Sequence, residues 1–132
     1  MAGTSDLLGL TASMTVTTLI LAGAAGFMPR LVGDEPNPVV GIRTRATQSS
    51  PQAWRLAHLV AQPILRRTVW IAVVGLAIEL VLGVVAGFGS AASAVTAVAV
   101  AVVVFLVLLY AGYRGNAAAK TLTPGPGSTA EL

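Results

Sequence analysis

Three long apolar segments alternate with polar ones along the chain, and they run from Leu7 to Met28, from Val69 to Phe88 and from Ala91 to Tyr113. A bilayer core about 30 Å thick is crossed by roughly 20 apolar residues in an α-helix. Each of the three segments reaches that length. The pattern therefore predicts an all-α membrane protein with three transmembrane helices.

The first apolar segment is predicted to be a retained helix. A secretory signal begins with a basic region, whereas the residues before Leu7 contain Asp6 and no lysine or arginine. The small residues Ala22-Gly23-Ala24 resemble a cleavage site, so removal of this segment stays the less favoured alternative.

The polar region between the first two apolar segments predicts a loop with one short helix. Prolines in Gly33 to Pro38 favour extended geometry and oppose a helix. Ser50 before Pro51 is typical of a helix start, and Pro63 is expected to end the helix, which gives residues 51–62. At 100° per residue, one side of that helix is polar, with Gln52, Arg55, His58 and Gln62. We expect a short amphipathic helix at the membrane interface.

The whole chain is thus predicted to have five parts. They are an N-terminal segment with the first helix (1–29), a basic loop (30–68), the second helix (69–88), the third helix (91–113) and a disordered tail (114–132). The run Pro-Gly-Pro-Gly-Ser near the end is the reason for expecting disorder in the tail.

Composition and charge agree with a membrane location and add an orientation. Only 10% of the residues are charged and 55% are hydrophobic, whereas soluble domains average about 25% charged residues. All eight basic residues lie in the predicted loop or tail, and short basic loops stay cytoplasmic. The N-terminus is therefore predicted outside and the C-terminus in the cytoplasm. The net charge of +3 fits anionic lipid headgroups as partners and requires no nucleic acid.

The sequence offers little for catalysis. It has no cysteine, which excludes disulfides and thiolate metal sites. It also contains no recognisable catalytic triad, no phosphate-binding glycine loop and no cluster of metal ligands. We expect a protein that is not an enzyme and that needs no cofactor or metal.

Glu79 is the one ionisable residue inside a predicted transmembrane helix. Such residues are costly in a bilayer and normally face another helix. Gly75, Glu79, Gly83 and Gly87 recur every four residues, so Glu79 shares a face with small residues that suit close helix packing. A threonine at similar depth in the first helix, among Thr15, Thr17 and Thr18, would satisfy a protonated carboxyl. Glu79 is either such a structural group or a proton-coupled or ligand-sensing one.

The polar loop carries a recognisable motif. It contains Asn37, then Gly41-Ile42-Arg43-Thr44, then Thr47, and later Trp54 four residues before His58. This run resembles the signature loop of the SdpI-like family, which precedes two transmembrane helices; Arg45 stands where that family usually has proline. The resemblance implies a bacterial cytoplasmic-membrane protein that resists a secreted antimicrobial peptide. In some members it also implies a transcriptional repressor held at the membrane.

The motif residues can also be interpreted by their chemistry. Gly41 permits backbone geometry closed to other residues, and Arg43 beside Thr44 and Thr47 offers donors suited to phosphate or carboxylate. Trp54 and His58 are one helical turn apart and share a neighbourhood. They are either binding or signalling residues, or an interfacial anchor and a single structural hydrogen bond.

Two other functions remain open. The chain is alternatively an accessory or structural subunit of a larger membrane complex, or a homo-oligomer, that docks through Gly75, Gly83 and Gly87. A third possibility is an oligomer that transports a small ion or lipid around Glu79.

Overall fold

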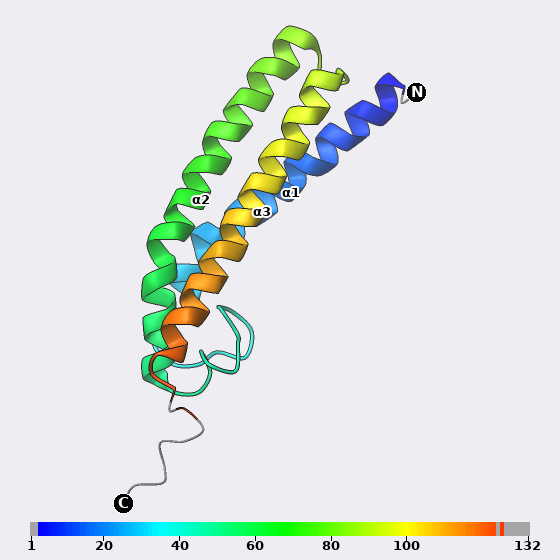
Figure 1. The fold of residues 1–132 in the computed structure, drawn as a ribbon. Coiled ribbons are helices and arrows are strands. Elements are labelled where there is room, and N and C mark those ends of the chain that lie inside the picture. The colour runs from blue at the N-terminus through cyan, green and yellow to red at the C-terminus, as the bar shows by residue number, and fades with distance from the viewer. Residues whose placement is uncertain (1–2, 124, 126–132) are drawn as a thin grey trace, which may run out of the picture. The chain divides into compact units, whose positions relative to one another are not determined.

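A computed structural model describes residues 3–123 and 125 of the 132-residue chain. Within these residues the chain forms three α-helices and no strand, namely α1 (Thr4–Leu31), α2 (Pro51–Ala86) and α3 (Ala91–Lys120) (Figure 1). Each helix is long and apolar enough to cross a membrane. The prediction of an all-α fold with three membrane-spanning helices is confirmed.

Helix α2 begins where the sequence predicts and ends much later. The Ser50 hydroxyl accepts a hydrogen bond from the Ala53 backbone N–H at 3.1 Å, as an N-cap does, and Pro51 opens the helix. The helix then continues through Pro63 to Ala86. A separate short helix over residues 51–62 is therefore not seen. An interior proline removes one backbone donor and crowds the carbonyl group four residues earlier, but the buried residues Ala61 and Leu65 keep the helix packed on both sides of Pro63.

Helix α3 also runs further than its apolar segment. It continues past Tyr113 to Lys120, so the beginning of the predicted tail is helical. Alanine is the best helix former, and residues 117–119 are all alanine. The prediction of disorder for the end of the tail falls on residues 124 and 126–132, which lie outside the described residues.

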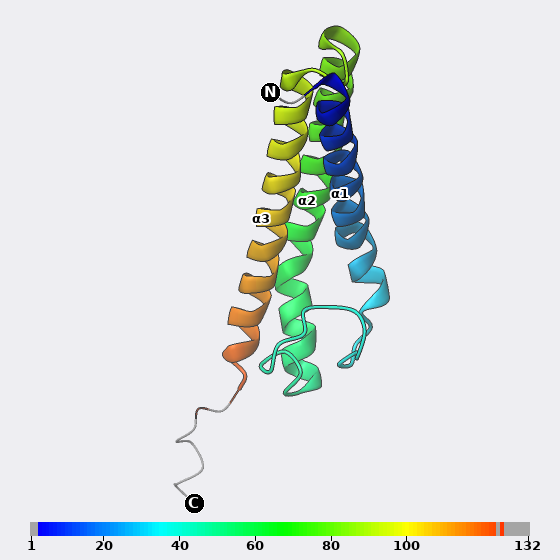
Figure 2. The same ribbon diagram turned by 90° about the vertical axis from the view of Figure 1, so that its right-hand side faces the viewer.

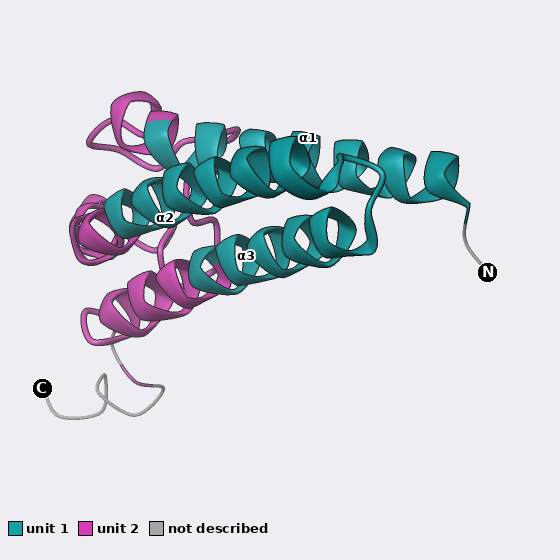
Figure 3. Cartoon of the chain, turned by 90° about the horizontal axis from the view of Figure 1, so that it is seen from above, with its two compact units in different colours: residues 1–26, 65–108 teal, residues 27–64, 109–132 magenta. Residues whose placement is uncertain are grey.

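The chain divides into two units (Figure 3). Unit 1 contains residues 1–26 and 65–108, and unit 2 contains residues 27–64 and 109–132. Unit 1 holds most of the apolar length of the three helices, and unit 2 holds the loop between α1 and α2.

Within unit 1, the segments of α1, α2 and α3 lie side by side (Figure 2). Gly75 of α2 faces Val100 of α3 so closely that an added Cβ would meet a Val100 methyl group at 2.5 Å. The outward residues are large and apolar, for example Ile20 and Val85, which are 66% and 79% exposed. Such a surface suits lipid chains, since water would not be tolerated against it.

Within unit 2, small residues bring the elements close together. Ala53, Ala57 and Ala119 are fully buried in one cluster, with Ala46 packed against it. The loop between α1 and α2 is thus held against both α2 and α3 in this unit, and this packing positions the residues of the sequence motif.

Candidate functional site

The motif segment, residues 37–47, is called the signature loop below, and Asn37 begins it with a tight turn. The Asn37 side-chain oxygen accepts hydrogen bonds from the backbone N–H groups of Val39 at 2.8 Å and Val40 at 3.1 Å. Its amide nitrogen donates to the Leu31 carbonyl at 3.4 Å. Asparagine is suited to this role because its side chain imitates a backbone turn. Asn37 therefore ties the loop to the end of α1.

Gly41 lets the loop backbone lie directly on two rings of α2. Its φ angle is +116°, in the region that favours glycine. A Cβ atom at this position would be 2.6 Å from His58 Nε2 and 2.8 Å from Trp54 Cη2. Only a residue without a side chain fits this approach.

Both ring nitrogens of His58 are engaged. Nε2 accepts a hydrogen bond from the Ile42 backbone N–H at 2.9 Å. Nδ1 lies 2.8 Å from the Trp54 carbonyl oxygen, to which it can only donate. The ring is therefore neutral and carries its hydrogen on Nδ1, because a second N–H would oppose that of Ile42.

His58 lies before the apolar part of α2, which starts at Val69. The surroundings of its ring also favour the neutral form. Burial lowers the pKa of His58 below its ordinary value of 6.5, and this outweighs the opposite effect of the hydrogen bond to Trp54. Desolvation disfavours the charged imidazolium.

Trp54 is a core side chain, with 0% of its surface exposed. Its indole N–H donates to the Gly33 carbonyl at 3.3 Å, and its ring lies tilted against His58 with centroids 4.3 Å apart. Of the two interpretations of Trp54, this geometry favours a structural role over exposure to a partner.

Thr44 and Thr47 close the other end of the loop. Thr47 is fully buried; its hydroxyl lies 2.6 Å from the Ile42 carbonyl and accepts the Thr44 backbone N–H at 2.9 Å. The Thr44 hydroxyl donates to the Asn116 side-chain oxygen on α3 at 2.7 Å. These bonds fasten the loop to α3.

Sequence reasoning did not identify Asn116 or its neighbour Gly115. A Cβ on Gly115 would be 2.6 Å from the Ile42 side chain and 2.9 Å from the Ala57 carbonyl. The available signal is weak: a glycine and an asparagine directly follow the third apolar segment, where both residue types are unremarkable in a tail.

Arg43 and Arg45 are the charged residues of the signature loop. Both are exposed, and among the described residues neither has an ion pair or a hydrogen bond. The packed residues around them thus present two guanidinium groups to the surroundings. Such a group binds phosphate or carboxylate through paired hydrogen bonds.

Glu79 in unit 1 is a separate polar feature. It is 5% exposed, and its Oε2 atom lies 2.8 Å from the Thr15 hydroxyl. That hydroxyl also lies 2.8 Å from the Thr11 carbonyl, and it has a single hydrogen to donate. The Thr15 hydroxyl hydrogen is thus shared between the Glu79 carboxyl oxygen and the Thr11 carbonyl oxygen.

Two buried polar atoms near this contact have no hydrogen-bond partner among the described residues, namely Glu79 Oε1 and the Thr18 hydroxyl. Thr17, the other candidate, bonds instead to the Ser13 carbonyl within α1. Of the three threonines considered for Glu79, the structure brings Thr15 to it.

The three glycines of the Glu79 face have different surroundings. Gly75 and Gly83 are buried; an added Cβ on Gly83 would overlap the Phe88 ring. Gly87 is exposed, has a φ of +93° and follows the last residue of α2. It therefore caps the helix, and only Gly75 makes a close contact with another helix.

The described residues include no group of three histidine, cysteine, aspartate or glutamate side chains that could hold a metal ion.

The geometry thus defines a multi-pass membrane protein whose signature loop packs against α2 and α3. The sequence profile of the SdpI/YfhL protein family matches residues 34–113, which is more than half of the chain, so the chain belongs to this family. Comparison with curated proteins and with solved structures finds no match.

Proposed function

We propose that the protein is an SdpI-type immunity protein of the bacterial cytoplasmic membrane, which binds a secreted antimicrobial peptide without catalysis. The family match over residues 34–113 carries this proposal. The match includes the whole signature loop together with the apolar segments of α2 and α3, and the apolar segments are the parts that a peptide arriving in the membrane would meet.

The distribution of charge supports one orientation. Six arginines lie between residues 30 and 67, and Arg114 and Lys120 lie in the last part of α3. Loops rich in basic residues stay in the cytoplasm. The N-terminus is then outside, the C-terminus inside, and residues 51–62 of α2 lie at the inner interface.

The peptide-binding surface belongs to the outer faces of α2 and α3 in unit 1. An apolar groove of about 460 Å³ lies there, lined among others by Trp70, Val74, Gly75, Ile78 and Val103. It contains almost no polar surface, so its occupant is a hydrophobic segment that is already in the bilayer. A membrane-active peptide has that property.

Arg43 supplies the cytoplasmic contact in this mechanism. Its neighbours in the signature loop are fixed by His58, Thr47 and Asn116, so its position is set by the folded loop. A regulatory protein with an exposed carboxylate, or an anionic headgroup, would pair with it.

The test uses a bacterium that carries this chain. A deletion strain is exposed to a panel of secreted antimicrobial peptides, and the chain is then restored on a plasmid. We expect at least one peptide that inhibits the deletion strain more strongly and loses this effect on complementation. Equal sensitivity to every peptide, together with degradation of the chain when a partner protein is removed, would instead favour an accessory subunit.

A further inference from the structure

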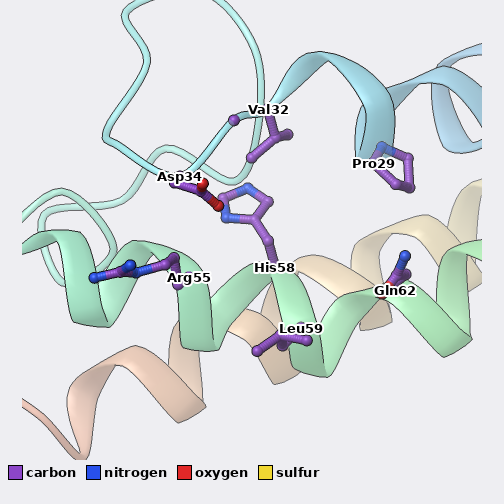
Figure 4. Close-up of a pocket in the computed structure, with 8 residues that line it drawn as sticks. Pro29, Val32, Asp34, Arg55, His58, Leu59 and Gln62 are labelled. Carbon is purple, nitrogen blue, oxygen red and sulfur yellow. The ribbon is translucent and has the colours of Figure 1, made fainter.

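A cleft in unit 2 lies between the end of α1 and the first turns of α2 (Figure 4). Its volume is about 320 Å³, at the lower end of the range for small-molecule sites. The lining residues are Pro29, Val32, Gly33, Asp34, Arg55, His58, Leu59 and Gln62. Apolar and charged side chains thus share one small space.

Two opposite charges line this cleft without neutralising each other. Asp34 comes from the connection after α1 and Arg55 from α2, and no ion pair joins them or links either to another described residue. In Figure 4 the guanidinium of Arg55 points away from the carboxylate of Asp34. A ligand that carries both a cation and an anion would satisfy both ends of the cleft.

The remaining polar groups further restrict which ligands fit the cleft. His58 contributes only its ring surface, because both nitrogens bond to the Ile42 and Trp54 backbones. Gln62 offers a side-chain amide that has no partner among the described residues. The cleft therefore has one anionic end, one cationic end and one neutral donor and acceptor.

We infer that this cleft binds a phosphoethanolamine group, with the ammonium at Asp34 and the phosphodiester at Arg55. A primary ammonium donates three hydrogen bonds to a carboxylate and to an amide oxygen, and a guanidinium matches two phosphate oxygens. The inference goes beyond the proposed peptide immunity and does not depend on it.

The source of the group is a membrane lipid. Pro29 closely follows the first apolar segment, and Gln62 comes shortly before the second, which begins at Val69. Both sides of the cleft are thus connected to the ends of membrane helices, where headgroups are found. Val32 and Leu59 add an apolar wall that suits the glycerol and first methylenes of a lipid.

The experiment measures lipid retention by the purified full-length chain. The protein is placed in nanodiscs that contain equal amounts of phosphatidylethanolamine, phosphatidylglycerol and phosphatidylcholine. Native mass spectrometry then counts the lipids that remain bound to the protein after it is released from the nanodisc. We expect preferential retention of phosphatidylethanolamine. Phosphatidylglycerol lacks the cation for Asp34, and the trimethylated amine of phosphatidylcholine has no N–H to donate.

Charge-neutral variants locate the site. Asp34→Asn and Arg55→Gln should each lower the preference for phosphatidylethanolamine about tenfold, as expected for a lost charged hydrogen bond. Glu35→Gln and Arg30→Gln are the matched controls, because these residues are exposed neighbours that do not line the cleft. The controls should keep the preference.

Three results would overturn the inference. They are equal retention of the three lipids, an unchanged preference in Asp34→Asn and Arg55→Gln, and an equal loss in the two controls. Glycerophosphoethanolamine is added as the soluble competitor. If it displaces the lipid at equimolar concentration, the group chemistry stands but the assignment to a membrane lipid is overturned.

Discussion

Replacing Gly41 by alanine should loosen the signature loop more than any other glycine change in unit 2 outside the helices. The backbone there has a φ of +116°, a conformation that costs a residue with a side chain on the order of 1–3 kcal/mol. The new Cβ would also lie 2.6 Å from His58 Nε2 and 2.8 Å from Trp54 Cη2. Trp54 is fully buried, so His58 is the ring that must move.

Moving His58 breaks its hydrogen bond with the Ile42 backbone N–H. This bond is partly buried, and a partly buried donor left without a partner costs about 1 kcal/mol, at the lower end of the range for buried donors. The two contributions together lower the free energy of unfolding by about 2–4 kcal/mol. That is a large share of the roughly 5–15 kcal/mol typical of folded proteins.

The assay is unfolding in mixed micelles with increasing sodium dodecyl sulfate, followed by tryptophan fluorescence. The chain has two tryptophans, so a Trp70→Phe background reports Trp54 alone. The Gly41→Ala variant should unfold at clearly lower detergent fraction and show an exposed Trp54 earlier.

Two glycines serve as controls for the two contributions. Gly33 has a φ of +67° but open space around it, so Gly33→Ala should cost only the backbone term of about 1–2 kcal/mol. Gly23 lies inside α1 with nothing near its added Cβ, so Gly23→Ala should be neutral or stabilising. Equal losses for Gly41→Ala and Gly33→Ala would refute the contact with the rings.

Three further predictions concern the other polar contacts. Glu79→Gln should keep abundance and stability, because its side-chain oxygen can still accept from the Thr15 hydroxyl, whereas Glu79→Ala should lose about 2 kcal/mol in the same unfolding assay; equal losses in both would contradict a structural hydrogen bond. For His58, the folded pKa lies below the ordinary 6.5, so the unfolded chain takes up the proton first as pH falls. The contribution of His58 to stability should be constant above pH 6.5 and decline below it, as measured by melting curves at several pH values. His58→Gln should flatten this dependence of stability on pH, and a gain in stability on acidification would be contrary evidence. Asn116→Ala removes the acceptor of the Thr44 hydroxyl and should speed tryptic cleavage after Arg43, while Asn116→Asp, which keeps an acceptor, should not; cleavage at the wild-type rate in Asn116→Ala would argue against this anchor.

The three helices are predictable because apolar length is a property of each segment alone. The ends of the helices are harder to predict from the sequence. Pro63 was expected to end a helix, yet α2 passes through it to Ala86, since neighbouring buried residues such as Leu65 stabilise the continuation. Likewise α3 continues to Lys120, because Ala119 packs against Ala53 and Ala57, a contact between residues far apart in the chain.

In the candidate site, too, local contacts are predictable from the sequence and long-range contacts are not. The spacing of Trp54 and His58 correctly places the two rings together, because residues four apart share a helix face. The contact of Gly41 with these rings and the bond from Thr44 to Asn116 join residues 13 to 72 positions apart in the chain. No local pattern encodes such distances, so the partners of the loop come only from the fold.

We propose that the packed signature loop presents Arg43 to a partner of the protein. The most direct measurement is the protection that Arg43→Gln gives a deletion strain against an inhibitory peptide, compared with wild type and Arg45→Gln at equal abundance. Arg43 and Arg45 are both exposed, so neither change should unfold the protein. We predict that Arg43→Gln loses protection and Arg45→Gln keeps it. Full protection by Arg43→Gln would contradict the account.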